Sequence, residues 1–322
     1  MTEELLTSVI PQNLAGQRID AALAVLFPDY SRSRLTQWVK QGQVELDGVI
    51  PRPRDKVYAE QQVVVKVQSL ACESEILPEN IALDVVYEDA DILIINKPVG
   101  MVVHPAAGNW NGTLQNALLF YDAVLASIPR AGIVHRLDKD TSGLLVVAKT
   151  LKAHKSLTEQ LQARTVHREY FALVNSVMTA GGTVDKPIAR DARERKRMAI
   201  REEGKEAITH YRVVEKYRRH TYIRVFLETG RTHQIRVHMS HIRFPLVGDT
   251  LYGSRAIVPK GAADSLIEAI RGFKRQALHA AKLGLIHPLT GEEMQWQVAV
   301  PDDMQHVIDE LRADQQANAE TE

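Results

Sequence analysis

The sequence is poor in cysteine and in long apolar runs. Cys72 is the only cysteine in 322 residues, which excludes an internal disulfide framework and a cysteine-rich zinc site and favours a reducing compartment. No apolar run approaches the roughly 20 residues that span a bilayer. The first ten residues, MTEELLTSVI, lack the basic and apolar segments of a secretory signal. We therefore expect a cytoplasmic protein with no membrane partner.

An excess of either charge is also missing. Forty Lys and Arg residues balance forty Asp and Glu residues, which excludes a uniformly basic nucleic-acid binder but permits local basic patches. Between residues 186 and 219, twelve basic residues stand against six acidic ones, and the run ARDARERKRMAIREEGK has no clean apolar period. This segment predicts a loop or hairpin that follows RNA phosphates, with a merely solvated basic loop as the alternative.

Several catalytic signatures are absent as well. The sequence has no GxxxxGK[ST], HExxH, GxSxG or GxGxxG motif, and the aspartate of HRLDKD is out of place for a kinase catalytic loop. His233, His238 and His241 lie close together, but their cluster holds no carboxylate, and neighbouring arginines would repel a dication. We expect no metal and no cofactor, with these histidines lining a polar site or contacting RNA.

A small N-terminal module is predicted over residues 9–70. In QRIDAALAVLF the apolar residues recur at steps of three and four, and YSRSRLTQWVKQG predicts a second helix with Ser31 as N-cap. VELDGVIP predicts two short strands around Asp47–Gly48, and QQVVVKV predicts another strand. Arg32, Arg34 and Lys40 flank the apolar face of the second helix, where they would converge on a phosphate backbone or lie on a solvated face.

A larger domain is predicted over residues 81–302, after a linker at 71–80 where no clear period is visible. The runs DILIIN, GLLVVA, REYFALV and HTYIRVFLET predict strands, and HKSLTEQLQA and ADSLIEAIRGF predict helices. This alternation is typical of an α+β domain with a substantial mixed sheet. Residues 303–322 are rich in acids and predict a flexible tail.

Asp138 is the strongest chemical candidate from the residues themselves. It lies among cations in GIVHRLDKDTSGLLVVAK, just before a run suited to a buried strand, where Gly143 permits a tight turn. Nearby cations favour the ionised form of a carboxylate, which is then able to act as nucleophile or base. The alternative is a salt-bridged aspartate in a turn, and Asp140 has the character of turn or capping chemistry.

Five stretches resemble a known family. GIVHRLDKDTSGLLVVAK, DILIINKPVGMVVHP, HREYFALV, GRTHQIRVHMSHIRFPLVGD and LHAAKLGLIHP resemble, in order, the signatures of the RNA pseudouridine synthases related to synthases A, C and D of the large ribosomal subunit. SRSRLTQWVKQGQVELDG resembles the α-L RNA-binding module of ribosomal small-subunit protein four. The resemblance implies an α+β catalytic domain of the pseudouridine synthase type, with a mixed, largely antiparallel sheet, behind a small N-terminal α-L domain.

The resemblance also implies roles for individual residues. Asp138 corresponds to the essential aspartate, Arg236 to its basic partner, and Tyr170 to the tyrosine that stacks on the target base. Arg136 corresponds to the arginine that fills the space of the flipped uridine, with a phosphate contact as the alternative. The other residues expected to face RNA are His135, Asn96, Lys97, His104, Arg231 and His233.

The implied reaction is isomerisation of uridine in 23S ribosomal RNA, in a hairpin (helix 69) of naked RNA or of a large-subunit precursor, by a monomer without cofactor that supports ribosome assembly. Two rival hypotheses stay open. One is a non-catalytic ribosome-assembly factor that uses the same basic surfaces. The other is a metal-dependent hydrolase built on the histidine cluster, which chelators would inactivate.

Overall fold

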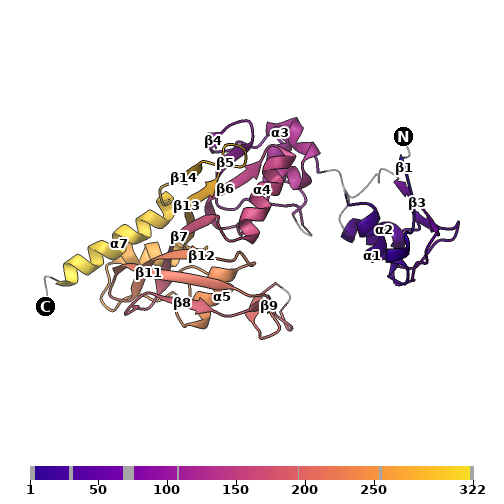
Figure 1. Ribbon diagram of the computed structural model, residues 1–322. Helices are drawn as coiled ribbons and strands as arrows, with labels where there is room; N and C mark the ends of the chain where they lie inside the picture. Colours follow the sequence, from indigo (N-terminus) through magenta and orange to yellow (C-terminus); the bar gives the residue numbers. More distant parts are fainter. Residues whose placement is uncertain are drawn as a thin grey trace. The chain divides into compact units, whose positions relative to one another are not determined.

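The computed structural model describes residues 4–28, 32–67, 76–106, 109–194, 196–253 and 256–319. They form two compact units, which divide between residues 75 and 76 (Figure 1). Each unit has a hydrophobic core of its own. No helix within these ranges is long and apolar enough to cross a membrane.

The N-terminal unit packs two helices on a three-stranded antiparallel sheet. The helices are α1 (Ile19–Leu26) and α2 (Arg32–Lys40), and the strands, in sheet order, are β1 (Glu4–Val9), β3 (Gln62–Val67) and β2 (Val44–Leu46). Leu23, Leu35 and Trp38 from the helices meet Val63 and Val65 of β3 in a core from which water is excluded. A short 3₁₀ helix, Gln12–Leu14, joins β1 to α1.

The structure confirms both helices and the third strand of this unit, and it corrects two details. Asp47 and Gly48 do form a tight turn, with φ of 51° and 80°, and Leu46 of β2 bridges Val49 across it. Residues 49–61 form no second strand, however, and β2 pairs along its length with β3. The unit begins at β1 and so at residue 4, not at residue 9. We missed β1 because it is a mostly exposed edge strand with a weak apolar pattern. The N-cap predicted at Ser31 lies outside the described residues.

The second unit is built on one large sheet. Its strand order is β4 (Val85–Glu88), β5 (Ile92–Lys97), β6 (Ser142–Ala148), β13 (Leu278–Ile286), β7 (His167–Asn175), β12 (His220–Leu227), β11 (Ile208–Lys216) and β8 (Gly182–Asp185), with β14 (Glu293–Gln297) also paired to β13. Neighbouring strands are antiparallel except β6 and β13, which run parallel. The predicted mixed, largely antiparallel sheet is therefore confirmed.

Helices cover both faces of this sheet (Figure 1). In β5, Ile92 and Ile94 pack toward α4 (Leu151–Gln162), whereas Leu93 and Ile95 belong to the core under α3 (Leu114–Tyr121) and α5 (Gln234–His241). At the other end, α6 (Asp264–Gly272) and α7 (Asp302–Ala319) cover β7 and β12. Because both faces are buried, these strands are continuously apolar rather than alternating.

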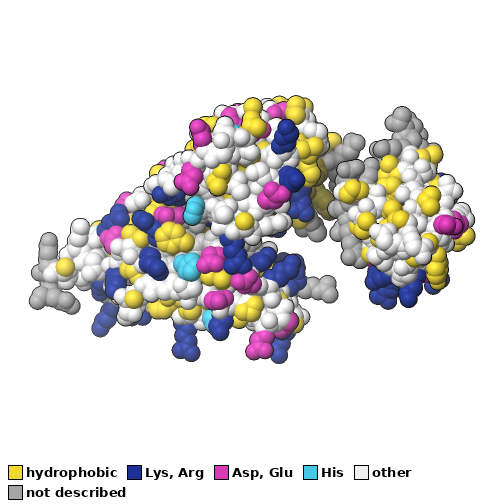
Figure 2. All heavy atoms as spheres, in the orientation of Figure 1, with side chains coloured by type: hydrophobic (Ala, Val, Ile, Leu, Met, Phe, Trp, Pro, Cys, Tyr) yellow, Lys and Arg dark blue, Asp and Glu magenta, His cyan; other side chains and the backbone are white. Residues whose placement is uncertain are grey.

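The basic segment forms a small hairpin. Strands β9 (Ile188–Arg190) and β10 (Met198–Ile200) pair antiparallel. Of the loop or hairpin predicted for this segment, the hairpin is therefore confirmed. Arg190, Arg193 and Lys196 are exposed around it. Figure 2 shows Lys and Arg side chains over this part of the unit, intermixed with acidic ones. The hairpin therefore presents positive charge to solvent.

The predicted boundaries of the second domain are wrong at both ends. Residues 303–322 are not a flexible tail, because α7 continues to Ala319 and buries Met304, Val307, Ile308 and Leu311 against α6 and the sheet. These residues recur at helical steps, a pattern that the many acids obscured. At the other end, Glu79 accepts the backbone N–H of Gly112, so residues 76–80 belong to this unit and not to a linker. Residues 71–75 lie outside the described part.

Candidate functional site

Asp138 lies in a loop that leads from the 3₁₀ helix Pro129–Gly132 into β6. Gly143, at the start of this strand, has a φ of 113°, and a Cβ there would lie 2.2 Å from the carbonyl oxygen of Ala280 on β13. The glycine therefore serves the close approach of β6 and β13 and not the turn that we predicted. This close contact fixes the end of the loop that carries Asp138.

The same loop is held by buried polar side chains. Lys97 is only 1% exposed, and its ammonium donates to the carbonyls of Pro98, Met101 and Lys139. Arg275 donates to the carbonyl of Asp140 at 3.4 Å and to both carboxylate oxygens of Asp303, on α7, at 2.7 Å. The first turn of α7 is thus tied to the loop that carries Asp138.

The carboxylate of Asp138 meets a buried arginine. Nη1 of Arg236, on α5, donates to Oδ2 of Asp138 at 3.1 Å, while its Nε and Nη2 donate to the two oxygens of Asp249 at 2.7 and 2.9 Å. Burial opposes the charge of this guanidinium, but Asp249 and Asp138 outweigh burial and raise the pKa of Arg236. Arg236 is therefore a permanent cation shared between two carboxylates.

His233 approaches the other oxygen of Asp138. Its Nε2 lies 3.9 Å from Oδ1, and the residue precedes α5 in the left-handed conformation, with a φ of 57°. Burial lowers the pKa of His233, although the charge of Asp138 opposes the shift. The imidazole is therefore neutral near pH 7, which makes it a hydrogen-bonding group rather than a second cation.

A narrow cavity opens beside Asp138. It has a volume of about 50 Å³, and its apolar wall includes Leu227, Ile235, Leu278 and the buried ring of Tyr170 on β7. Burial raises the pKa of Tyr170, so its hydroxyl keeps its proton at neutral pH. The cavity combines a carboxylate with an aromatic face, which suits a flat, uncharged ring.

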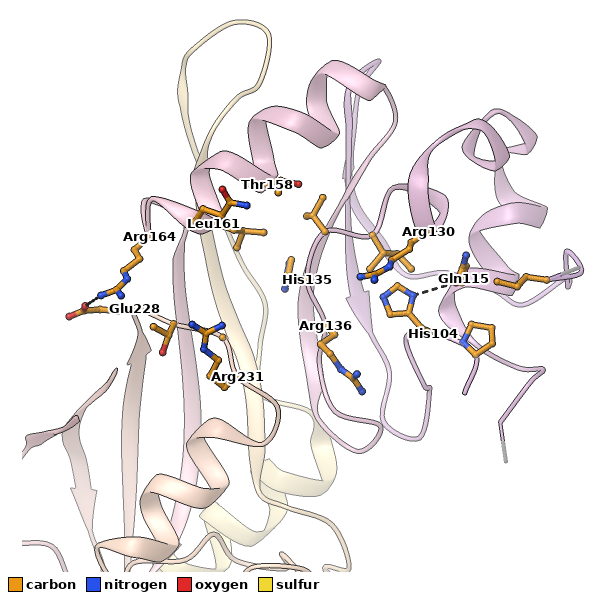
Figure 3. Close-up of a pocket in the computed structure, with 17 residues that line it drawn as sticks. His104, Gln115, Arg130, His135, Arg136, Thr158, Leu161, Arg164, Glu228 and Arg231 are labelled. Atoms are coloured by element: carbon orange, nitrogen blue, oxygen red, sulfur yellow. Dashed lines mark hydrogen bonds and ion pairs between the residues drawn. The ribbon is translucent and has the colours of Figure 1, made fainter. Parts of the chain in front are cut away.

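A larger, basic groove adjoins this cavity. It has a volume of about 860 Å³ and is lined by Arg130, Arg136, Arg164 and Arg231, among other residues. Arg136 and Arg231 line both the groove and the cavity. Figure 3 shows Arg164 and Arg231 on one side of the groove, with Arg130 and Arg136 across from them. The charge of the groove suits a polyanion that passes by Asp138.

The two predicted histidines of the groove are neutral. Nε2 of His135 accepts the backbone N–H of Val146 at 3.2 Å, and burial lowers the pKa of His135 to about 3. Nδ1 of His104 lies 3.3 Å from the amide oxygen of Gln115, and burial lowers the pKa of His104 too. They therefore add hydrogen-bonding surface rather than charge.

The structure brings together most of the residues predicted from the sequence. Those that line the cavity or the groove are Asp138, Tyr170, Arg236, His233, Arg136, Arg231, His104 and His135. Asn96 instead donates to Asp84 and lines neither. The prediction that Lys97 shapes an RNA-binding rim is wrong, because its side chain is buried.

Of the basic residues predicted in the N-terminal unit, Lys40 is exposed at the end of α2. The side chains of Arg32 and Arg34 lie outside the described part. His238 is buried and bonds to Thr209 and to the carbonyl of Lys186, so its ring is committed to the core. Within the described ranges, no three His, Cys, Asp or Glu residues are placed to hold a metal ion.

Sequence reasoning missed Asp249 and Tyr252, although both lie in the stretch PLVGDTLYG. Asp249 is 3% exposed and also accepts the backbone N–H groups of Leu251 and Tyr252. The signal available in the sequence was an acid placed directly after a glycine, Gly248. In the structure this glycine has a φ of 72°. A carboxylate in so tight a turn is well placed to collect backbone donors.

Comparison with known proteins gives matches over almost the whole chain. A family model described as RNA pseudouridylate synthase matches residues 91–241, and one described as S4 domain matches residues 17–63. The ribosomal large subunit pseudouridine synthase D of Xanthomonas campestris is 52% identical over 320 residues, which cover 99% of this chain and 96% of that protein. Its namesake from Escherichia coli K12 is 53% identical over 310 residues, which cover 96% and 95%.

Solved structures agree with these matches. The human RNA pseudouridylate synthase domain containing 4 superposes with a TM-score of 0.56 at 25% identity, covering 71% of this chain and 92% of that one. The human domain containing 1 has the same fold, with a TM-score of 0.53. Because the chain is more than half identical to the two synthase D relatives over nearly its full length, it belongs to the RNA pseudouridine synthases, the isomerases that convert uridine in RNA to pseudouridine.

Proposed function

We propose that this protein isomerises specific uridines to pseudouridine in 23S ribosomal RNA, in the hairpin called helix 69, and thereby supports assembly of the large subunit. The names of its relatives support the large-subunit target, and the S4 domain supports an RNA substrate. We further propose that it acts as a monomer in the cytoplasm, on naked RNA or on a large-subunit precursor. No cofactor enters the proposed reaction.

One observation carries the chemistry: the contact between Arg236 and the carboxylate of Asp138 at the mouth of a narrow cavity. Isomerisation breaks the bond between N1 of the base and C1′ of the sugar, turns the base and joins its C5 to C1′. C5 then releases its proton, and N1 takes one up. An ionised carboxylate is able to act in this sequence as nucleophile or base. Asp138 is the carboxylate held beside the space that a base would enter.

Tyr170 and Arg136 have complementary proposed roles. Tyr170 would stack on the flipped uracil and assist removal of the proton from C5. Because its hydroxyl is protonated, it would give up its own proton as it takes up that one. Arg136 is exposed between cavity and groove, where it would occupy the space that the flipped base leaves. Flipping costs a few kcal/mol of unstacking, and an inserted guanidinium plane would offset part of that cost.

The remaining predicted residues would bind the rest of the RNA. Arg231, His104 and His135 line the groove beside the cavity, where they would contact the strand that flanks the uridine. Arg32, Arg34 and Lys40 of the N-terminal module would contact phosphates elsewhere on the hairpin. The basic hairpin β9–β10 would add further phosphate contacts.

The decisive experiment is release of tritium from ribosomal RNA labelled at C5 of uridine. We expect release without added metal or nucleotide, and we expect Asp138→Asn to abolish it while RNA affinity stays within a few-fold. Asp140→Asn, two residues away in the same loop, is the matched control and should keep its activity. If the protein released no tritium from any ribosomal or transfer RNA, a non-catalytic assembly factor would be the better reading.

The target uridines require a separate test. Pseudouridines mapped in the 23S RNA of cells that lack this protein should be missing from helix 69 and present elsewhere. Restoring the wild-type protein, but not the Asp138→Asn variant, should bring them back. Loss at other positions, with helix 69 unchanged, would contradict the proposed target without contradicting the reaction.

A further inference from the structure

The hydroxyl of Tyr252 links the basic hairpin to the carboxylate of Asp138. Its oxygen accepts the backbone N–H of Met198, the first residue of β10, at 2.7 Å. The same oxygen lies 2.7 Å from Nδ1 of His233, and Nε2 of His233 faces Oδ1 of Asp138 at 3.9 Å. A continuous chain of polar groups therefore runs from the hairpin to Asp138.

These contacts select one tautomer of His233. If Nδ1 carried the proton, it would donate to the oxygen of Tyr252, and the tyrosine's own proton would have to find another acceptor in a residue that is only 7% exposed. The lone pair of Nε2 would then face a carboxylate. If Tyr252 donates to Nδ1 instead, Nε2 carries the proton and directs an N–H dipole at Asp138.

The ring of Tyr252 is itself held in place. The guanidinium of Arg236 lies 5.0 Å from its centroid and that of Arg197 lies 5.2 Å away, within the range of cation–π attraction. The ring of His233 packs edge-on against it, with centroids 5.5 Å apart. Tyr252 therefore touches both groups that contact Asp138, and its hydroxyl is the part that acts on His233.

The two oxygens of Asp138 thus have different partners. Arg236 donates to Oδ2 at 3.1 Å, whereas the N–H of His233 would approach Oδ1 from the other side. At 3.9 Å this N–H is beyond hydrogen-bond distance, so it acts on Oδ1 through its dipole. A donor at Oδ2 and a dipole at Oδ1 together favour one orientation of the carboxylate about the Cβ–Cγ bond.

We propose that Tyr252 is a positioning residue for the isomerisation: its hydroxyl fixes His233 as the tautomer with the proton on Nε2, and His233 in turn orients Asp138. This inference rests on the proposed function, because it needs Asp138 to be the reacting carboxylate. The hydrogen bond from Met198, which pairs with Arg190 at the loop end of the hairpin, makes this end of the hairpin part of the same arrangement.

The test is Tyr252→Phe, which removes the hydroxyl and keeps the ring. We expect the rate constant of tritium release at saturating RNA to fall about tenfold, the lower end of the losses found when hydrogen-bond partners that orient metal-ligating histidines are removed. The dissociation constant for RNA should change less than twofold. Tyr87→Phe is the matched control, since it also removes a hydroxyl that donates one hydrogen bond, to Asp89 at 2.8 Å, on another part of the sheet. Its rate constant should be unchanged.

Two further measurements separate positioning from loss of structure. In ¹⁵N-histidine spectra of the folded protein, the ring of His233 should have Nδ1 unprotonated and Nε2 protonated, and Tyr252→Phe should shift it toward a mixture. In a double-mutant cycle, Tyr252→Phe should cost nothing more once His233→Ala is present.

Three results would overturn the inference: an unchanged rate in Tyr252→Phe, an Nδ1-protonated ring in the wild type, or a full additional loss in the His233→Ala background. Failure of the proposed function is distinguishable, because it appears as tritium release by Asp138→Asn. An inactive Asp138→Asn beside a fully active Tyr252→Phe would refute only the inference about Tyr252.

Discussion

Arg236 and Asp249 are joined by two hydrogen bonds of 2.7 and 2.9 Å, and the carboxylate of Asp249 is entirely buried. This pairing takes Nε and Nη2 of the guanidinium and leaves Nη1 for Asp138. Asp249 also accepts two backbone N–H groups, which hold its carboxylate in place. It therefore positions the guanidinium of Arg236 beside the loop that carries Asp138. The position of the cation beside Asp138 is therefore set by a residue 13 positions further along the chain.

Asp249→Asn should destabilise the fold and impair the reaction. The substitution leaves a buried guanidinium with one carboxylate in place of two, and loss of one partner from a buried pair costs about 3–5 kcal/mol. Chemical denaturation should detect this loss. Asp309→Asn, which breaks an exposed pair with Arg312 on α7, is the control and should cost less than about 0.5 kcal/mol. Equal losses in both variants would contradict the role of Asp249.

The contribution of Asp249 should depend on pH in a defined direction. Hydrogen bonds from Arg236 outweigh burial and hold the pKa of Asp249 below its ordinary value of 3.8. A lowered pKa in the folded state stabilises the fold fully above the unfolded pKa, and this stabilisation is lost as pH falls through the folded pKa. The gap in unfolding free energy between wild type and Asp249→Asn should thus be constant from pH 5 to 7 and narrow below about pH 4. A gap that widens in acid would refute this assignment.

Helix α7 should contribute to stability as a core element. Leu311 is 1% exposed among residues of α6 and the sheet, so Leu311→Ala should lower the free energy of unfolding by about 2–5 kcal/mol. Gln315→Ala, at an exposed position of the same helix, is the control and should change it by less than about 0.5 kcal/mol. If denaturant titrations gave the same midpoint for Leu311→Ala and wild type, residues 302–319 would not contribute to the core, and the predicted tail would be the better description.

The sequence was informative where a local pattern carries the structure. The apolar runs of β5 and β6 predicted buried strands because a strand covered on both faces is apolar at every position. In α7 the many acids drew attention away from Met304 and Leu311. A count of charges over the whole segment ignores that apolar residues recur on one face of the helix. Family resemblance singled out Asp138 and Arg236, which lie 98 residues apart. Their mutual contact depends on how the sheet brings β6 beside α5, and no local pattern predicts it.

The residues that support the site were harder to predict for a different reason. Lys97 has the composition of a surface residue, yet its ammonium is buried because three carbonyls of two loops converge on it. Burial lowers the pKa of Lys97 to about 8, although the charges of Asp140 and Asp138 oppose the shift, and the three hydrogen bonds satisfy the buried ammonium. The role of Tyr252 likewise depends on two contacts of its hydroxyl, with the backbone of Met198 and with the ring of His233. Such roles follow from tertiary structure, so a reading of one sequence assigns them only through resemblance.

A second, polar cavity that Asp138 also lines leads to a last prediction. It has a volume of about 270 Å³ and is lined by Arg136, Lys139 and Lys274, among others. The two lysines are exposed, and within the described ranges neither ammonium has an ion-pair partner. A uridine turned toward Tyr170 carries a phosphate on each side, and a phosphate in this cavity would meet these cations.

Lys139→Gln and Lys274→Gln should therefore each weaken RNA binding a few-fold and reduce the slope of log Kd against log salt by about 0.7–0.9, the value expected for one lost phosphate contact. The rate constant of tritium release at saturating RNA should stay within twofold, because neither lysine touches the reacting atoms. Lys260→Gln is the control, since this exposed lysine lines neither cavity beside Asp138. A salt slope unchanged in both lysine variants would mean that the RNA backbone leaves Asp138 by another path, along the groove of Arg136 and Arg231.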